Sequence, residues 1–362
     1  MSWLDGLMVT LGMRDSVGAV GSGGPRAAVQ GTDVSLLTSE ALAEFLRVGG
    51  GTNKSGRVVG ERVAMRNSTL NRAVLLISSS IGMLPLNLFE RGSDGTIGKA
   101  DSHPVHKLLR VRPNAAQTPF EFKSYMQGRA LLHGNAYAYK VPGVNRVQAL
   151  WPLDPRRTRG AQDEQFNLAY RYSGKNGSSR TFKADEVLHL RAPWTCDGVL
   201  GVGLLQLAGE ALGLADITEE AAAAFLRNGA QPGGALKHPK SLSDGAINRL
   251  REQMRDRFEG SENAGRWFVF EEGMEATPFP SNSKDAQALE QRKYQAEEIS
   301  RFTGVPRPLL MFDETSWGSG IEALGLFYVT YCLMPWFVAW EEAIARSLLS
   351  DAERETHYAK FN

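Results

Sequence analysis

The sequence has few cysteines and no excess of either charge, and both absences bear on the class of protein. Its 362 residues include two cysteines, Cys196 and Cys332, which stand far apart and form no CxxC pair. We therefore expect free thiols in a reducing compartment, with neither a disulfide framework nor a cysteine zinc site. The 41 basic and 40 acidic side chains give a net charge of +1, whereas proteins that bind nucleic acid tightly and nonspecifically carry a basic excess.

Nucleotide-binding motifs are also incomplete. The stretch GGGTNKS at 49–55 has Asn53 where a phosphate-binding loop needs glycine before its lysine. In GVLGVGLLQ at 198–206, Gln206 replaces the last glycine of the dinucleotide fingerprint. We interpret the second stretch as a tight turn that enters a helix, and we expect no cofactor.

Catalytic and metal motifs are missing as well. His133 and His189 lie in apolar stretches without a nucleophile at readable spacing, so we interpret both as structural histidines. The sequence contains neither GxSxG nor HExxH, and no carboxylate pair has convincing metal spacing. We predict no catalytic residue and no metal site.

Long apolar runs are limited to one segment. The N-terminus, MSWLDGLMVTLGMRD, has no basic region and carries Asp5 early, which is not typical of a signal peptide. Residues 323–340 run without a charge, near the lower length limit for a membrane span, but Pro335 interrupts them. We expect a helix over 320–349 that is buried on most sides, within the fold or between subunits, and no membrane.

The first part of the chain divides into an arm and an α+β lobe. Residues 1–60 contain Gly- and Ser-rich connectors and predict a partly flexible arm. From residue 61 to 203, helical and strand patterns alternate. Apolar spacing predicts a helix over 70–84 with Ser68 or Thr69 as N-cap, and Thr118 begins a second helix with a capping box. Strand patterns follow at 86–91, 137–141, 146–153, 168–173 and 181–192.

The pattern changes at residue 204. Two long helices are predicted, at 204–229 and 282–304, and they carry a small α/β module at 230–281 between them. Basic residues on the module helix and on the second long helix are interleaved with acidic ones, so surface ion pairing accounts for most of them. These basic residues are Arg249, Arg251 and Arg255 on the module, and Lys284, Arg292, Lys293 and Arg301 on the helix.

The loop at 305–319 combines residues that restrict the backbone with residues that leave it flexible. Pro306 and Pro308 stiffen its beginning, and Gly318 and Gly320 free its end. Its middle carries Asp313, Glu314, Thr315, Ser316 and Trp317. Adjacent acids in a loop are usually just solvated.

Taken in order, these segments resemble the HK97-type portal proteins of tailed bacteriophages. The matching sequence segments run from about Val58 to Leu349. They include SSSIGMLPLNLFER, HPVHKLLRVRPNAAQTPFEF, LLHGNAYAY, LWPLDPRR, ADEVLHLR, DGVLGVGLLQLA, FLRNGAQPGGAL, DAQALEQRKYQAEEISRFTGVPRPLLMF and MPWFVAWEEAIARSLL. No single segment is decisive, but the order and spacing of the segments along the chain are specific to this family.

The resemblance implies an α+β, portal-type fold with a wing at 61–203 and a long wing helix within 320–362. It also implies stem helices at 204–229 and 282–304, a clip at 230–281 and a tunnel loop at 305–319. Relatives continue past the wing helix, whereas this chain ends at HYAKFN. By resemblance we expect a truncated C-terminus, in which the following crown segment is either naturally absent or removed.

The resemblance further implies a ring of roughly twelve copies at a capsid vertex, assembled in the cytoplasm of the bacterial host. Double-stranded DNA would pass through it, touching residues 313–317 and, in part, the basic residues of the second stem. The clip arginines would meet partner proteins. The implied partners are the terminase large subunit, a head-completion connector protein and the major capsid protein.

Two other classes of function stay open at this point. A soluble α/β enzyme would use residues 305–319 as an active-site lid, and it would need a catalytic constellation beneath them. A membrane-anchored complex would insert the apolar segment at 323–340 and would need detergent.

Overall fold

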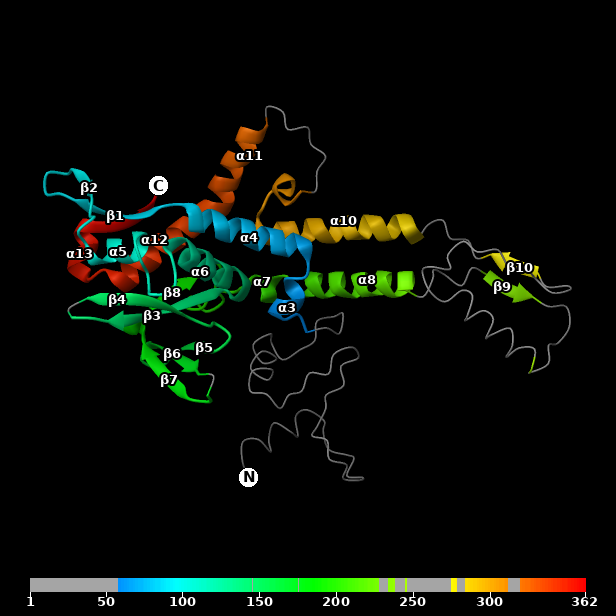
Figure 1. Cartoon of the computed structure of the whole chain (residues 1–362), viewed down its shortest axis with the longest axis horizontal. Coiled ribbons are helices and arrows are strands. Elements are labelled where there is room, and N and C mark those ends of the chain that lie inside the picture. Colours follow the sequence, from blue (N-terminus) through cyan, green and yellow to red (C-terminus); the bar gives the residue numbers. More distant parts are fainter. Residues whose placement is uncertain are drawn as a thin grey trace, which may run out of the picture. The chain divides into compact units, whose positions relative to one another are not determined.

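The computed structural model describes residues 58–144, 146–174, 176–227, 234–237, 245, 275–278, 284–311 and 320–362. All of them fall within one unit of the chain. Figure 1 shows the α+β class that the patterns predict, with helices α4 and α6 beside small sheets. The arm at 1–57 and most of the module at 230–281 lie outside the described residues.

The described helices range from four residues to twenty. They are α3 (Glu61–Ala64), α4 (Ser68–Met83), α5 (Pro104–Arg110), α6 (Pro119–His133), α7 (Leu204–Leu207), α8 (Gly209–Arg227), α10 (Lys284–Thr303), α11 (Ile321–Phe327), α12 (Met334–Leu348) and α13 (Asp351–Thr356). A π-helical turn, η4 (Tyr328–Leu333), joins α11 to α12, and a 3₁₀ turn, η3 (Arg307–Leu310), follows α10. A second 3₁₀ turn, η1 (Ala184–Glu186), lies between two strands.

The strands form antiparallel sheets throughout the described residues. They are β1 (Leu86–Arg91), β2 (Ile97–Lys99), β3 (Asn135–Pro142), β4 (Val147–Leu153), β5 (Thr158–Gln162), β6 (Leu168–Ser173), β7 (Ser179–Lys183), β8 (Val187–Arg191), β9 (Gly234–Lys237), β10 (Glu275–Pro278) and β11 (His357–Phe361). Their orders are β11-β1-β2, β4-β3-β8, β5-β6-β7 and β10-β9. The predicted strand at 181–192 is two strands, β7 and β8, separated by η1.

Helices α4 and α6 pack closely at the centre of the core. A Cβ on Gly82 would overlap Ser124 Oγ, and one on Gly128 would lie 3.4 Å from Ser78 Oγ. The predicted N-cap of α4 was wrong by one residue. Asn67 is the cap, since its Oδ1 accepts a hydrogen bond from Leu70 N at 3.1 Å. The helix therefore begins at Ser68, which lies within its first turn.

The capping box predicted for α6 is confirmed. Thr118 Oγ1 accepts a hydrogen bond from Glu121 N at 3.2 Å, and Thr118 N donates to the Glu121 carboxylate at 2.8 Å. Gly134, at φ 78°, ends the helix in the left-handed conformation that glycine adopts without strain.

The glycines of the 198–206 stretch serve packing. A Cβ on Gly201 would overlap Gly134 O, and one on Gly203 would overlap Gly134 N and Leu132 O. Asn135 joins the two segments, because its Nδ2 donates to Gly201 O at 2.7 Å and its Oδ1 accepts from Gly201 N at 2.9 Å. The interpretation of this stretch as a tight turn entering a helix is confirmed.

The long helix predicted from residue 204 is interrupted. Ala208, with φ −99° and ψ 9°, leaves the helical conformation and separates α7 from α8. Ala208, Leu204 and Leu205 are all buried in the core. Their packing sets the orientation of α7. The helix predicted over 320–349 is likewise divided, into α11, η4 and α12.

The glycine contact yields the first prediction. Replacing Gly203 with alanine inserts a methyl group where two backbone segments touch, and neither segment can move without disturbing the sheet. We expect Gly203→Ala to lower the free energy of unfolding, measured by urea denaturation, by more than about 3 kcal/mol. Gly209→Ala is the matched control, since nothing lies within 4 Å of its added Cβ. A Gly203→Ala variant as stable as that control would contradict the packing role.

Candidate functional site

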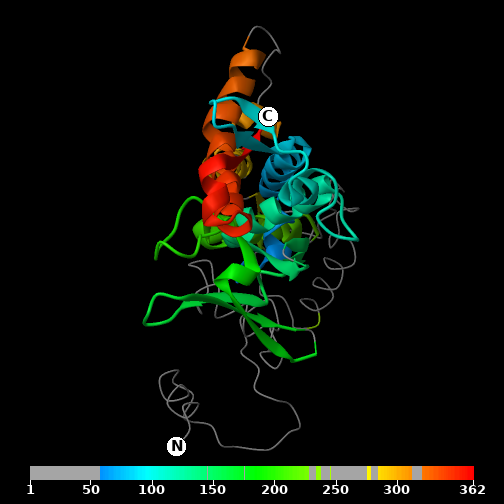
Figure 2. The same cartoon turned by 90° about the vertical axis from the view of Figure 1, so that its left-hand side faces the viewer.

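The apolar segment after residue 320 is buried at one end and exposed at the other. In α12, Trp336, Trp340, Ala343 and Ile344 are buried, whereas α11 has no buried residue. Figures 1 and 2 show α11 rising away from α4 and α6. The large apolar side chains that stay exposed are Ile321, Leu326, Phe327, Val329, Tyr331, Met334 and Val338. We call these seven residues the apolar face.

This exposure corrects one sequence expectation. Of the two places proposed for the helix, within the fold or between subunits, the first is wrong for α11, which has no buried residue, whereas Tyr328, Cys332 and Leu333 of η4 are buried in the fold. Leu326 is 68% exposed and Tyr331 is 67% exposed. Within the described residues, Ile321–Leu348 is also the stretch that meets the length and composition of a membrane span, and 22% of its apolar 18-residue window is buried.

The turn η4 fixes the point where the helix leaves the core. Tyr328 Oη lies 3.3 Å from Ser80 Oγ of α4, and Cys332 Sγ donates to Thr303 O of α10 at 3.7 Å. Burial raises the pKa of the Cys332 thiol to about 12 and that of the Tyr328 hydroxyl to about 12. The wider π-helical turn therefore presents two neutral polar groups to α4 and α10.

The start of the 305–319 loop is held firmly. Gly304, at φ 70°, ends α10 as predicted, and Ser300 Oγ donates a hydrogen bond to Val305 O at 2.8 Å. Pro306 then leads into η3, whose Leu310 is buried. Arg72 Nε of α4 donates to Leu309 O at 3.3 Å. The loop beyond residue 311 therefore departs from a fixed origin.

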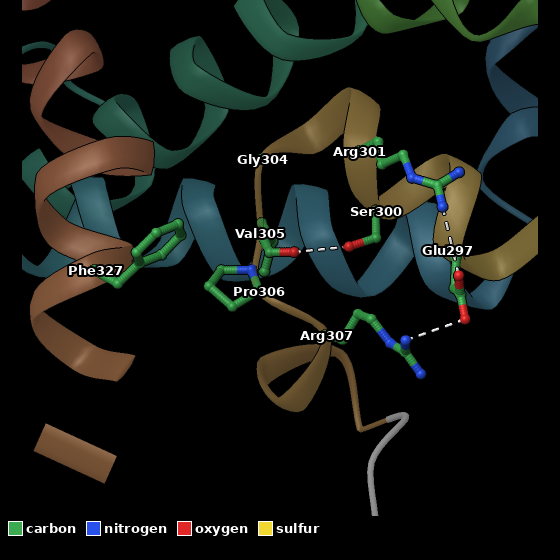
Figure 3. A pocket seen from close by; sticks show the side chains of 8 residues that line it. All are labelled: Glu297, Ser300, Arg301, Gly304, Val305, Pro306, Arg307 and Phe327. Carbon is green, nitrogen blue, oxygen red and sulfur yellow. Dashed lines mark hydrogen bonds and ion pairs between the residues drawn. The ribbon is translucent and has the colours of Figure 1, made fainter. Parts of the chain in front are cut away.

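A hollow of about 340 Å³ lies where α10, this origin and α11 meet. Figure 3 shows Phe327 on one side and the arginines of the other side directed toward Glu297. Glu297 accepts from Arg301 at 3.5 Å and from Arg307 at 3.1 Å. Ser300, Gly304, Val305 and Pro306 complete the lining. Because its charges are paired and Phe327 forms one side, the hollow is better suited to hold a side chain than to catalyse a reaction.

The two long helices lie side by side (Figure 1). Gln295 Nε2 of α10 donates to Thr218 Oγ1 of α8 at 3.1 Å, and Ile299 is fully buried. Lys293 and Arg301 are exposed, and Arg301 stacks over the Tyr294 ring at 5.7 Å. At 100° per residue, Lys293 points away from Gln295.

Other predicted site residues lie beyond this description. The side chains of Lys284 and Arg292 are among them, although both residues belong to α10. The loop residues Asp313, Glu314, Thr315, Ser316 and Trp317 and the module arginines Arg249, Arg251 and Arg255 also lie outside the described residues. Their proposed roles stay predictions.

His189 is a structural residue, as its sequence context predicts. Asn135 Nδ2 donates to Gly201 O, so its Oδ1 accepts from His189 Nε2 at 2.8 Å. His189 Nδ1 then accepts from Tyr170 Oη at 3.0 Å. Burial lowers the pKa of His189 well below its usual value, so the ring stays neutral.

His133 takes part in an ion-paired contact between α3 and α6. Its Nε2 lies 3.2 Å from Glu61 Oε2, and Arg129 Nη1 lies 2.7 Å from Glu61 Oε1. The hydrogen bond from His133, with the charge of Arg129, lowers the pKa of Glu61 to about 2 against the effect of burial. Within the described parts of the chain, His, Cys, Asp and Glu side chains form no group of three that could hold a metal ion.

The sequence did not single out the apolar face or Arg307 as parts of a site. The available signal for the face was the eighteen-residue uncharged run, which shows apolar character but not which half the core covers. Arg307 stands between two prolines and carries no motif. Its contact with Glu297 depends on how α10 ends.

Comparisons with known proteins converge on one family. The family model described as "Phage portal protein" matches residues 68–362. The portal protein of Enterobacteria phage HK97 is 32% identical over 83% of this chain and 71% of its own length. A probable portal protein of Streptomyces phage phiC31 is 29% identical over 86% of this chain and 70% of its own length.

Solved structures show the same fold. A chain from the neck of an empty gene transfer agent particle aligns with a TM-score of 0.63 at 24% identity, covering 88% of this chain and 89% of that one. An HK97-family phage portal protein from Corynebacterium diphtheriae aligns with a TM-score of 0.58 at 20% identity, covering 84% of this chain and 96% of that one.

The packing of η4 against α10 predicts unequal reactivity of the two thiols. Cys196 is exposed, whereas Cys332 is buried and its raised pKa keeps it protonated at pH 8. With a chromogenic disulfide reagent we expect one fast phase from Cys196 and a second phase at least about a hundredfold slower, which requires local opening. Cys196→Ser should remove only the fast phase. Equal rates for the two thiols would contradict the packing of η4.

Proposed function

Because the chain belongs to the phage portal protein family, we propose that copies of it form a ring around a channel at one capsid vertex. Double-stranded DNA enters and leaves through this channel. A related neck structure computed with C12 symmetry supports a ring of twelve copies. The ring belongs to the virion and assembles in the host cytoplasm.

The apolar face is the observation in this chain that carries the proposal. A lone subunit would leave seven large apolar side chains of α11, η4 and α12 in water. Fully burying one such side chain is worth about 1.5–3 kcal/mol, so covering the group favours association strongly. A ring repeats this gain at every contact between subunits, and no membrane is needed to cover the face.

We assign the parts of the ring by position. The wing comprises 61–203 together with 320–362, the stems are 204–229 and 282–304, and the clip is 230–281. The contact between α8 and α10 supports the paired stems. Twelve helices of about 10 Å diameter give a circumference of roughly 120 Å and a hole of about 28 Å, which admits a duplex.

The proposed channel does not grip DNA. Arg301 and Arg307 are both engaged with Glu297, so their charges are offset on the helix and at the loop origin. A wall that held phosphates tightly would slow DNA translocation, because every contact must break at each step. Residues 313–317 form the tip of the tunnel loop and touch the DNA, and Lys284, Arg292 and Lys293 face the channel more loosely.

Partner proteins meet the ring at its ends in this proposal. Arg249, Arg251 and Arg255 of the clip contact the terminase large subunit during packaging and a head-completion connector protein afterwards. The wing contacts the major capsid protein. These assignments rest on position in the family's order of segments.

The enzyme alternative gains no supporting observation from the described residues. The hollow beneath the loop origin is lined by Glu297, Arg301 and Arg307, whose charges are paired, and it presents no nucleophile beside a base. The portal family is structural, which favours the noncatalytic interpretation.

Charge on the apolar face should prevent the ring. We expect the native chain to sediment at about 475 kDa, twelve times the 39.6 kDa of one chain. The double substitution Phe327→Asp and Tyr331→Asp should shift the protein to single chains, since each interface would then bury charge. Val144→Asp is the control because Val144 is 90% exposed on the β3–β4 turn. A ring that persists in the double variant would remove the apolar face from the interface.

The loop should be dispensable for assembly but required for transport. We expect deletion of residues 313–318 to leave the sedimentation of the ring unchanged and to reduce DNA packaging into capsids sharply. Protection of packaged DNA from nuclease provides the measurement. Loss of the ring in this variant would instead show that the loop is an assembly element.

A further inference from the structure

The outer face of the β5-β6-β7 sheet carries two arginines in direct opposition. In the antiparallel register Arg159 of β5 pairs with Arg171 of β6, and both side chains are exposed. Tyr170 and Phe182, one position along, are buried on the opposite face. Because side chains alternate along a strand, the two arginines share the face that points away from the core.

Neither arginine has an acidic partner among the described residues. Arg171 Nε donates to the Ser179 hydroxyl at 3.1 Å, and Arg159 makes no side-chain contact of this kind. Arg180, on the other face of the same sheet, shows the contrast. Its guanidinium lies 3.8 Å from Glu186 and stacks over the rings of Tyr139 and Phe182.

The opposed pair does not serve the fold. Like charges directly opposite on neighbouring strands are destabilising. Neither residue caps a turn or covers a core residue through any contact in the described chain. A surface that keeps two guanidinium groups close together, at a cost in stability, is suited to an anion that binds both of them.

A hollow lies one row further along the sheet from the arginine pair, and neither arginine is part of its lining. It has a volume of about 660 Å³, and its lining includes Ala161, Ala169 and Lys183. These three residues form the next row of the same face, since Ala161 pairs with Ala169 and Ala169 with Lys183. The two alanines leave room for a small apolar side chain within reach of the arginines.

We propose that this outer face, defined by Arg159, Arg171, Ala161, Ala169 and Lys183, docks an acidic segment of another protein. A carboxylate of the segment binds between Arg159 and Arg171, and a neighbouring small apolar side chain enters the hollow. This surface is separate from the apolar face, and the proposal does not depend on the ring.

The local charge favours a protein over nucleic acid. Asp163 and Asp185 line the same hollow and repel a phosphate backbone or a run of carboxylates, so the segment presents one carboxylate to the arginines and an apolar side chain to the hollow. Tight nonspecific binding of a duplex needs a broad basic field, whereas here the basic groups are confined to two rows of one small sheet. A single carboxylate with a small apolar neighbour matches both the charge and the space.

The test uses the full chain and a short fluorescein-labelled peptide with one glutamate among alanines. Fluorescence anisotropy should detect binding at low salt, and the matching glutamine–alanine peptide should bind at least about tenfold more weakly. The double substitution Arg159→Gln and Arg171→Gln should weaken binding of the acidic peptide by at least about tenfold. Arg66→Gln with Arg146→Gln is the control, since it removes the same charge from exposed positions elsewhere.

Each other outcome overturns the proposal. Equal weakening in both double variants would indicate a general charge effect. Binding of a double-stranded oligonucleotide, but not of the peptide, to the same arginines would assign the face to nucleic acid. Absence of any binding would leave the face without a ligand. Arg159→Gln should hold or raise the melting temperature, and a clear fall would show that Arg159 serves the fold.

Discussion

The position of the apolar helix depends on one buried contact. Trp340 is fully buried, and its Nε1 donates a hydrogen bond to Gln127 Oε1 of α6 at 2.9 Å. This contact fixes α12 against the core, and the continuous backbone of η4 carries that orientation into α11. The core covers one side of α12 and cannot also cover α11. Exposure of the apolar face is therefore a consequence of how well its base is anchored, and in the proposed ring a neighbouring subunit covers it.

Local chemistry allowed much of the wing to be predicted. The capping box at Thr118, the glycine ends at Gly134 and Gly304 and most strands follow from short-range rules that act within a few residues. The misplaced cap at Asn67, the break at Ala208 and the pairing of β11 with β1 do not. Each depends on contacts with distant segments, which a single sequence does not display.

The candidate surfaces were harder to predict than the fold. The uncharged run at 323–340 shows that the segment is apolar enough to be buried. Which part of it the core buries becomes clear only from the contact between Trp340 and Gln127. Similarly, Arg159 and Arg171 are twelve positions apart, and only the β5–β6 register brings them together. The loop at 305–319 stood out in the sequence because prolines and glycines act locally, yet the DNA contact proposed for it depends on the assembled ring.

The two surfaces differ in chemistry, and that difference sorts their partners. Burial of apolar area is nondirectional and scales with the area covered, so the apolar face suits a permanent contact repeated between identical chains. A pair of exposed arginines contributes less affinity, but it selects for charge and geometry and weakens with salt. Such a surface suits a partner that arrives and leaves. The proposed ring stays closed while its partner proteins exchange, so it uses both kinds of surface. Because the two surfaces lie on separate elements, release of a partner from the arginines does not weaken the contact between subunits.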